Sequence, residues 1–508
     1  MPDPLKPVVL AKRTATHMHS RETAGGGGGK ARHTWRFVML LTAGLSLAGG
    51  CTFHPIEQPK PGIESEPPRG TLSTTSARAE VRRLQQLLET VHPDPYFHRG
   101  RRAFRADAKR LVTRLKQPVD RLSFYRSLQE LVASLGDPHT ALSFPITDFR
   151  AYGIAGGTVF PFDVRWIQGH LVMASEGLAG ASLKQGDLIL SVNGVQPEDL
   201  MRGGSDKAPC GTASQAYSKW QVARRFGRHL WLHGERAPFD VLWRPVEGGD
   251  PRREVFGGKA AVPSPAGEQE AWRARRLSGG ILYLSMNGMT GDLGAFNRFL
   301  DSCFQRKPVR GVVVDLRENT GGDTRFAETM LRYLTRKPYR LMAGKEWKLS
   351  LEYRSYLTRL YGGLPPDLSG VAPGQTALIR RRVRSRPAAS VSFSGPVCFL
   401  IGPGTFSSAT MLAAAVKDYR LGTLIGEPTG GCPGGFGEVG YWQLPSSGFR
   451  VSVSTARFYR REAGQRGRPG PVQPDIVVAE SARDIRRGRD AVLKRAQEWL
   501  LENRRDSD

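Results

Sequence analysis

The hydrophobic pattern near residue 400 changes from a continuous run to helical spacing. "PVCFLI" (396–401) is a short apolar run typical of a buried strand. The apolar residues that follow recur on one face of a helix: Ala409, Leu412, Ala413 and Val416. The segment between them, "GPGTFS", is rich in glycine and small residues. It predicts a tight strand-to-helix turn that carries Ser407 and Ser408.

Strands and helices predicted in this way alternate through residues 266–480. The predicted strands are "GILYLSM", "GVVVDLR", "PVCFLI" and "LGTLIGE", and the predicted helices cover 292–305, 324–335 and 408–418. This alternation is typical of an α/β core whose parallel strands are covered by helices. Residues 441–458 predict a β-hairpin closed by "LPSSGF", and 481–508 predict one terminal amphipathic helix.

The first half of the chain follows two other patterns. Apolar stripes at helical spacing recur between 76 and 148, and the last helix ends in "SLGDPHTAL". Gly136 and Pro138 stop that helix, so His139 is expected in a loop. From 149 to 265 the alternation is strand-like, and "GDLILSVNGV" predicts a strand followed by an Asn-Gly turn.

The N-terminal segment has the order of a secretory signal. A basic stretch, "KARHTWR", precedes the apolar run "FVMLLTAGLSLAGG", which is short for a membrane span, and Cys51 follows at once. The small residues before Cys51 resemble a bacterial lipobox, which implies that this cysteine is lipidated and that the rest of the chain is exported. An uncleaved anchor is the alternative. Residues 52–75 are rich in proline and predict a flexible tether.

Composition narrows the choice of partners. The 508 residues carry a formal net charge of +27, and 39% of them are hydrophobic. A basic balance permits attraction to anionic lipid or nucleic acid, but no helix-turn-helix, zinc-finger or aromatic-basic RNA motif is present. We therefore expect no nucleic-acid partner and interpret the arginines as solvated surface positions.

Cysteine and histidine spacing predicts neither a metal site nor a cofactor. No CxxC motif occurs, and His229 and His233, four residues apart, lack a third ligand or an HExxH glutamate. We interpret these two histidines as surface residues. The pairing of cysteines cannot be deduced from one sequence, and we expect no disulfide bond.

Ser407 has two interpretations when its turn is considered alone. Serine often begins a helix by capping its free amide groups. The alternative is a nucleophile presented on a strained turn, with helix N-terminal amides facing a developing negative charge. "VVVDLRENTGGD" adds Gly321 and Gly322 at the carboxyl end of a buried strand, where open α/β sheets bind ligands.

Three stretches in order resolve this choice by resemblance. "SLGDPHTAL", "VVVDLRENTGGD" and "GTFSSATMLAAAVKDYRLGTLIGEPTGG", with a PDZ-like segment between the first two, resemble the C-terminal-processing (tail-specific) serine peptidases, a family that includes tricorn-core relatives. The resemblance covers most of 76–500. It implies an α/β fold with a mixed-sheet peptidase core of the ClpP/crotonase kind, an N-terminal helical subdomain and a degenerate PDZ-like β module.

The domain organisation that follows has six parts. They are a lipoprotein signal peptide (1–51), a linker (52–75), a helical subdomain (76–148), a PDZ-like module with an insertion (149–265), the peptidase core (266–480) and a C-terminal helix (481–508).

The resemblance also assigns roles to the turn residues. It implies that Ser407 is the nucleophile and that the amides of Gly321, Gly322 and Ser408 form the oxyanion hole. Tail-specific members activate the serine with a lysine 25 residues downstream, but here that position is Cys432, which we interpret as an inert loop residue.

Another base must therefore replace the missing lysine. Lys417 stands ten helical residues from Ser407, about 15 Å along the axis, and is too distant. In the tricorn-like branch the histidine of the Asp-x-His-Thr loop is the general base, which implies this role for His139. Glu462 and Asp137 are both possible orienting acids, and the sequence does not decide between them.

The sequence therefore predicts an exported serine endopeptidase that needs no metal or cofactor and cleaves polypeptides in the cell envelope. Thr52 follows the lipid cysteine where an aspartate would retain a lipoprotein at the inner membrane, which favours the outer membrane. Two alternatives stay open, namely a catalytically inactive peptide-binding lipoprotein and an esterase that uses the same serine.

Overall fold

The computed structural model describes residues 70–201, 212–262, 270–305, 308–383, 385, 389, 392–460 and 470–503, with the backbone alone for 212–214. All of these residues belong to one compact unit, His54–Asp508. The predictions for Cys51 and Glu462 fall outside the described residues. The six domain boundaries stay predictions.

The central sheet of the described residues has six strands in the order β11-β12-β13-β16-β17-β20. Their bounds are Trp272–Leu277, Ile281–Met286, Gly311–Asp315, Val397–Ile401, Thr423–Gly426 and Ile476–Val477. β11 pairs antiparallel with β12, and every later pair is parallel. All five residues of β13 and all five of β16 are buried, as expected for strands covered on both faces. The predicted mixed-sheet α/β core is confirmed.

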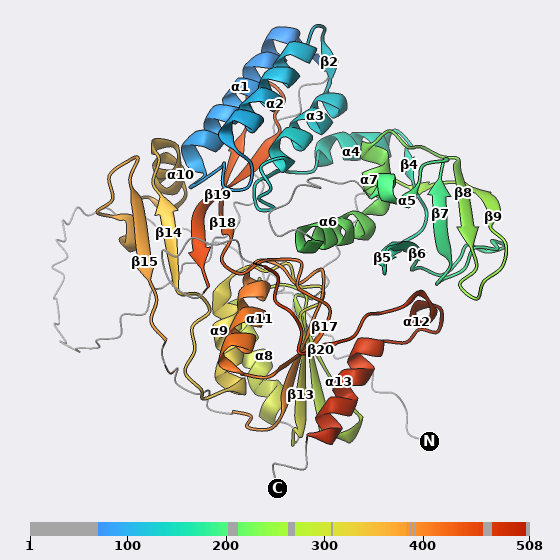
Figure 1. The fold of residues 1–508 in the computed structure, drawn as a ribbon, viewed down its shortest axis with the longest axis vertical. Helices are drawn as coiled ribbons and strands as arrows, with labels where there is room; N and C mark the ends of the chain where they lie inside the picture. The colour runs from blue at the N-terminus through green and yellow to red at the C-terminus, as the bar shows by residue number, and fades with distance from the viewer. Residues whose placement is uncertain are drawn as a thin grey trace, which may run out of the picture. The chain divides into compact units, whose positions relative to one another are not determined.

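Helices cover the two faces of this sheet (Figure 1). α8 (Leu293–Gln305), α9 (Thr324–Leu334) and α11 (Ser408–Tyr419) pack on one face through a core that includes Val312 and Val314. α13 (Ala491–Glu502) covers the other face, where Val313 points. Alternate residues of β13 thus serve opposite cores, because side chains on a strand alternate between faces.

The C-terminal segment differs from its prediction as one helix. The structure has a short α12 (Ala482–Arg486) before α13. Gly488 lies between them at φ +59°, and Asp490 caps the second helix by accepting from the Leu493 amide. A left-handed glycine followed by a fresh N-cap ends one helix and starts another.

A second sheet lies beside the central one and contains the predicted hairpin. Its order is β15-β14-β19-β18, and β3 (Ala141–Leu142) pairs with β19. The bounds of the other strands are Gly344–Lys348 for β14, Thr376–Arg380 for β15, Phe436–Gln443 for β18 and Arg450–Tyr459 for β19. Two short helices accompany them, α10 (Leu351–Tyr361) and the 3-10 turn η2 (Pro366–Leu368).

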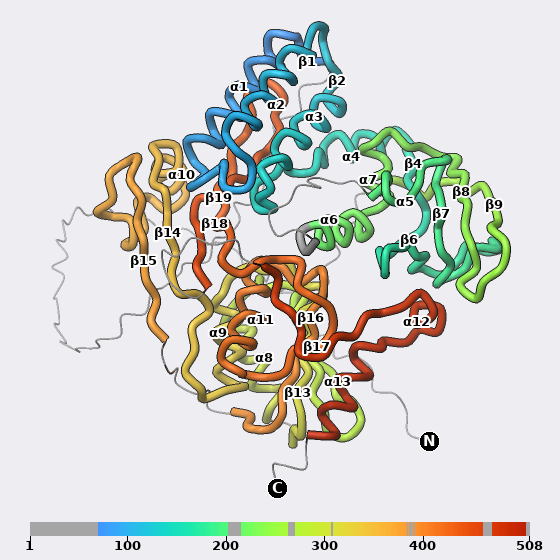
Figure 2. Tube along the Cα trace, in the orientation of Figure 1, coloured from blue at the N-terminus to red at the C-terminus, as the bar shows by residue number. Residues whose placement is uncertain are grey.

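The N-terminal helices come next, and the first three of them share a core with the tip of this hairpin. They are α1 (Thr74–Val91), α2 (Arg101–Arg114), α3 (Arg121–Ala133) and α4 (Ile146–Ile154), with short strands β1 (Thr71–Leu72) and β2 (Val119–Asp120). Leu84 and Phe124 share one core with Val451 and Val453 of β19. Figure 2 shows the red-orange hairpin among the blue helices, although more than 300 residues separate them along the chain. This contact positions the loop after α3 against the central domain.

A third sheet, order β5-β6-β7-β8-β9, is antiparallel and occupies the predicted PDZ-like region. Its strands are Val164–Ile167, His170–Met173, Leu188–Val192, Phe239–Arg244 and Arg252–Phe256. A small pair, β4 (Thr158–Val159) and β10 (Lys259–Ala260), adjoins it. Between β7 and β8 lie α5 (Pro197–Leu200), α6 (Thr212–Arg224) and α7 (Phe226–Leu232). Among the described residues no helix has both the length and the apolar character needed to cross a bilayer.

Candidate active site

Ser407 lies at the turn between β16 and α11 in a strained backbone conformation. Its φ is +53° and its ψ is −124°, outside the regions that non-glycine residues usually occupy. α11 begins at Ser408, and the Ser407 side chain makes no capping bond to the helix. The hydroxyl is therefore not used as a cap, and strain of this kind is typical of functional turns.

Gly321 and Gly322 allow a second turn to approach Ser407 closely. A Cβ on Gly321 would lie 2.7 Å from the Ser407 Cβ and 2.9 Å from the Ser408 nitrogen. Both glycines have positive φ, +98° and +132°. Met289 holds their turn in place, because its amide donates to the Gly321 carbonyl and its carbonyl accepts from Asp323. Only glycine fits at this contact.

The amides around Ser407 are not equivalent. The Gly321 N–H donates to Asn319 Oδ1 at 2.8 Å, so it is already engaged and its predicted place in the oxyanion hole needs correction. Ser408 is the first helical residue, and neither its N–H nor that of Gly322 has a hydrogen-bond partner within the part of the chain that the structure describes. These two amides can receive a developing negative charge.

His139 lies directly against Ser407, although 268 residues separate them in sequence. The His139 Nε2 atom is 3.0 Å from the Ser407 Oγ. Strand β3, two residues further on, pairs with β19 through Ala141 and Ser452. The Ser452 Oγ is 2.9 Å from the His139 carbonyl and accepts from the Ala141 amide at 3.2 Å. Pairing of β3 with the hairpin therefore brings the loop of the helical region to the serine.

Aromatic rings hold the imidazole on its other side. His139 stacks on Phe406, with ring centroids 4.6 Å apart and planes at 29°. Phe406 stacks in turn on Tyr217 of α6 at 4.0 Å, and Tyr217 on Trp220 at 5.8 Å. The helix inserted between β7 and β8 thus contacts the residue that precedes Ser407. Such stacking fixes the ring plane of His139.

Asp137 is the buried acid nearest to His139. Its Oδ1 accepts from the His139 backbone amide at 3.1 Å and lies 3.8 Å from Nδ1 of the same residue. Its Oδ2 accepts from His92 Nε2 at 3.1 Å and from the Thr140 and Ser454 hydroxyls, each at 2.6 Å. A separation of 3.8 Å is too long for a hydrogen bond, so Asp137 acts on the imidazole through its charge.

The hydrogen bonds also indicate which nitrogens carry protons. His92 Nδ1 accepts from the Asp94 amide, so its Nε2–H donates to Asp137. Burial would raise the pKa of Asp137, but the His92 hydrogen bond and the imidazole of His139 outweigh it and lower that pKa well below its ordinary value. A carboxylate facing Nδ1 favours the proton there, leaving Nε2 of His139 free to accept from Ser407.

The pKa of His139 lies below that of an ordinary histidine. Burial lowers it by disfavouring the charged imidazolium, and the nearby Asp137 carboxylate offsets this only in part. A base works in its neutral form, and a lowered pKa extends that form to lower pH. We expect the acid limb of kcat/KM to have its midpoint below about 6.5, the ordinary histidine value. Initial rates between pH 4 and pH 8 measure it; a midpoint above 7 would contradict this assignment.

Two other sequence expectations, those for Cys432 and Lys417, have clear outcomes. Cys432 is disulfide-bonded, so the expectation of no disulfide was wrong and its sulfur cannot serve as a base. Lys417 forms an ion pair with Asp475 at the far end of α11, as its distance from Ser407 required. The described residues contain no cluster of three or more His, Cys, Asp or Glu side chains that could hold a metal ion. Glu462 lies outside the described residues.

Sequence reasoning missed several residues that shape this site. His92 follows the first helix, and Asn319 lies inside the glycine motif, but neither carries a local signal for a partner so far along the chain. Ser452 and Ser454 had a weak signal: in "RVSVSTARF" serines occupy alternate positions of a strand. Tyr217 lies in a segment that resembled an insertion, where no motif points to a site.

Comparisons with known proteins identify the family that the core resembles. The model of peptidase family S41 matches residues 280–478, which include both glycines and Ser407. No curated protein matches the chain by sequence.

Solved structures share the fold. Mature CPAF is 14% identical with a TM-score of 0.58, and the match covers 85% of this chain and 98% of CPAF. A mutant of CPAF has a TM-score of 0.62 at 14% identity, covering 85% and 96%. Mature CPAF complexed with lactacystin has a TM-score of 0.56 at 15% identity, covering 85% and 98%. Residues 280–478, which make up most of the α/β core, thus match peptidase family S41, and the protein is a serine-type peptidase.

Proposed function

We propose that the chain is a serine endopeptidase of the tail-specific type in which Ser407 is the nucleophile and His139 the general base. The observation that carries this proposal is the 3.0 Å separation of His139 Nε2 and Ser407 Oγ at a strained turn. A nucleophile needs a base within hydrogen-bond reach, and imidazole is effective near neutral pH. The geometry favours this role over a catalytically inactive peptide-binding protein.

The reaction follows from these atoms. Ser407 Oγ attacks the scissile carbonyl carbon while its proton passes to His139 Nε2. The carbonyl oxygen, now negative, is stabilised by the amides of Gly322 and Ser408. The imidazolium returns the proton to the leaving amine, and an acyl-enzyme forms on Ser407. Water, deprotonated by the same nitrogen, then hydrolyses the ester and frees Oγ.

Asp137 is proposed as the positioning acid of His139. An Asp137→Asn substitution removes the charge that faces Nδ1 and weakens the bonds to His92 and Ser454. We expect kcat to fall by about 10- to 1,000-fold. The acid limb of the pH profile should also move further toward low pH, because the carboxylate that raises the pKa of His139 is gone.

A matched variant separates this effect from general damage. Asp418→Asn breaks a half-exposed ion pair with Arg460 and should leave kcat within about twofold. An Asp137→Asn protein that melts normally and retains wild-type kcat and pH profile would leave Glu462 as the acid to examine by the same substitution.

The substrate class can be tested with two kinds of acyl compound. Wild-type protein should cleave an unfolded polypeptide, and Ser407→Ala should not. Short acyl esters, run in parallel, measure intrinsic acyl transfer. Ester turnover with no cleavage of any polypeptide in a diverse library would replace the peptidase proposal with an esterase. Cleavage that is unchanged in Ser407→Ala would reject the site itself.

We further propose that the protein is a cell-envelope lipoprotein anchored through Cys51, with the outer membrane favoured. The anchor is supported by the order of a basic segment, a 14-residue apolar run and a cysteine. The outer membrane is favoured because position 52 holds threonine rather than aspartate. Radiolabelled palmitate should enter the wild-type chain in bacterial cells and not a Cys51→Ser chain. Equal incorporation into both would reject the anchor.

A further inference from the structure

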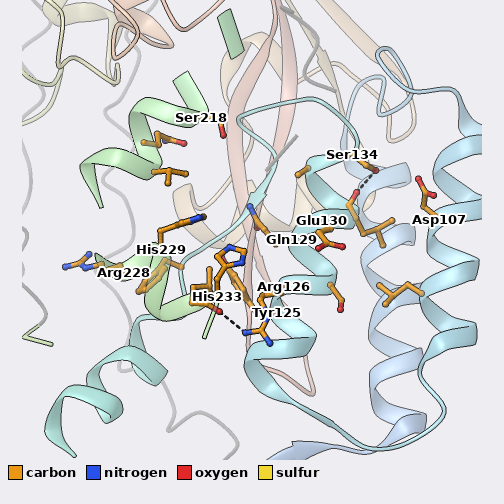
Figure 3. A pocket seen from close by; sticks show the side chains of 18 of the residues that line it. Asp107, Tyr125, Arg126, Gln129, Glu130, Ser134, Ser218, Arg228, His229 and His233 are labelled. Atoms are coloured by element: carbon orange, nitrogen blue, oxygen red, sulfur yellow. Dashed lines mark hydrogen bonds between the residues drawn. The ribbon is translucent and has the colours of Figure 1, made fainter. Parts of the chain in front are cut away.

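A cavity of about 680 Å³ lies between α2 and α3 on one side and α6 and α7 on the other. Figure 3 shows His229 and His233 on the α7 side, and Arg126, Gln129 and Glu130 of α3 across from them. The volume falls in the range of sites that hold small ligands or a few residues of a peptide. Nothing in the proposed reaction uses this cavity.

The charge of the lining is strongly unbalanced. Six arginines line the cavity against two acids: Arg99, Arg110, Arg114, Arg126, Arg225 and Arg228, with Asp107 and Glu130. Asp107 is already paired with both Arg99 and Arg110. Arg228 directs its guanidinium over the Phe149 ring, at 5.4 Å.

Four cavity arginines, Arg228 among them, have no carboxylate partner in the part of the chain that the structure describes. Arg126 donates to the Leu232 carbonyl and the Ser123 hydroxyl, and no ion pair involves Arg114 or Arg225. Burial and the neighbouring Arg225 lower the pKa of Arg228, as expected where positive charges gather without compensation. The cavity therefore offers several donors for carboxylates.

The two histidines add little charge near neutral pH. Burial and the adjacent His233 lower the pKa of His229 to about 4, and burial also lowers that of His233. The positive charge of Arg126 also lowers the pKa of His233. The positive charge of the cavity is therefore carried by arginine. Apolar side chains such as Leu131 and Phe144 complete the lining, which suits a peptide better than a bare ion.

The position of the cavity relates it to Ser407. One face of α6 supplies Tyr217 to the aromatic stack beside the serine, and Ser218 and Gln221 of the same helix line the cavity together with Arg225, which follows the end of α6. On the opposite wall Ser134 precedes the Asp137 to His139 loop by three residues. A helix with its side chains is about 10 Å thick, and about three residues of an extended peptide cover that distance.

We propose that this arginine-lined cavity is an exosite that binds an acidic segment of the polypeptide substrate while another part of the same chain occupies the active site. The role given to the cavity rests on the proposed peptidase function, whereas its test measures peptide binding alone. Carboxylates of the bound segment meet Arg114, Arg126 and Arg225, and its aliphatic atoms meet the apolar lining. Polypeptides with such a segment gain affinity without any change at the scissile bond.

The test measures binding, not turnover, in the Ser407→Ala protein. A fluorescein-labelled peptide rich in glutamate is titrated in a fluorescence anisotropy assay beside its glutamine counterpart. Arg114→Gln with Arg225→Gln should weaken binding of the acidic peptide by about five- to tenfold, because both arginines are exposed and unpaired. The glutamine peptide should bind weakly to every variant.

A matched control excludes the general basicity of the chain as the cause. Arg354→Gln with Arg359→Gln removes two exposed arginines of α10 that do not line the cavity, and it should leave the affinity within twofold. Equal weakening by both double variants, or equal binding of the two peptides, would overturn the exosite. Because the readout is binding, loss of the exosite and loss of peptidase activity are separate results.

Discussion

His139→Ala is expected to lower kcat/KM by about 10³- to 10⁵-fold without unfolding the protein. The 3.0 Å contact between Nε2 and Ser407 Oγ is the only route by which a described base reaches the nucleophile's proton. Alanine also removes the ring that stacks on Phe406, so a modest fall in stability should accompany the loss. Steady-state cleavage of an unfolded polypeptide measures the first effect, and thermal unfolding measures the second.

The control for this variant is another histidine with no contact to the site. His170 is exposed at the start of β6, and His170→Ala should keep kcat/KM within about twofold. Activity of His139→Ala that stays above a tenth of wild type would mean that a different group removes the serine proton.

Gly321→Ala is expected to reduce kcat/KM by at least about 100-fold and to lower the free energy of unfolding by about 2–4 kcal/mol. The new Cβ would lie 2.7 Å from the Ser407 Cβ, so the serine turn or the glycine turn must move. A φ of +98° adds strain for any residue with a side chain. Either movement displaces the Ser408 and Gly322 amides from the oxygen they are proposed to bind.

A second glycine separates strain from steric overlap. Gly248, between β8 and β9, has φ +104° but a Cβ there would meet no atom within 4 Å. Gly248→Ala should therefore cost only about 1 kcal/mol of stability and leave kcat/KM unchanged. Equal effects of the two substitutions would show that backbone strain alone, rather than contact with Ser407, explains the loss. Chemical denaturation and steady-state kinetics report both quantities.

Local pattern predicted the elements of the core well. β13 and β16 are apolar over nearly their whole length and are buried at every position, so a periodicity argument finds them easily. The turn at Ser407 was predicted for the same reason, because a glycine-rich segment joined a strand to a helical pattern. The prediction of one C-terminal helix was wrong because Gly488 and Asp490 interrupt a pattern whose apolar spacing continues on both sides of them.

The site itself depends on contacts that local pattern cannot describe. His139 and Ser407 were linked by family resemblance, whereas the structure explains the link through pairing of β3 with β19. The occupied Gly321 amide could not be foreseen, because an asparagine two residues earlier can face either way until the turn is built. The disulfide of Cys432 was missed because pairing depends on distances between segments, not on spacing.

The central claim is that His139 activates Ser407, and covalent labelling tests it most directly. Protein treated with diisopropyl fluorophosphate, whose fluoride is displaced by the serine oxygen, is digested, and the modified residue is located by mass spectrometry, with the labelling rate followed over time. The account predicts one adduct, on Ser407, that forms at least about 1,000-fold more slowly in His139→Ala and at the wild-type rate in His170→Ala. An unlabelled Ser407, or an adduct that forms equally fast without His139, would contradict it.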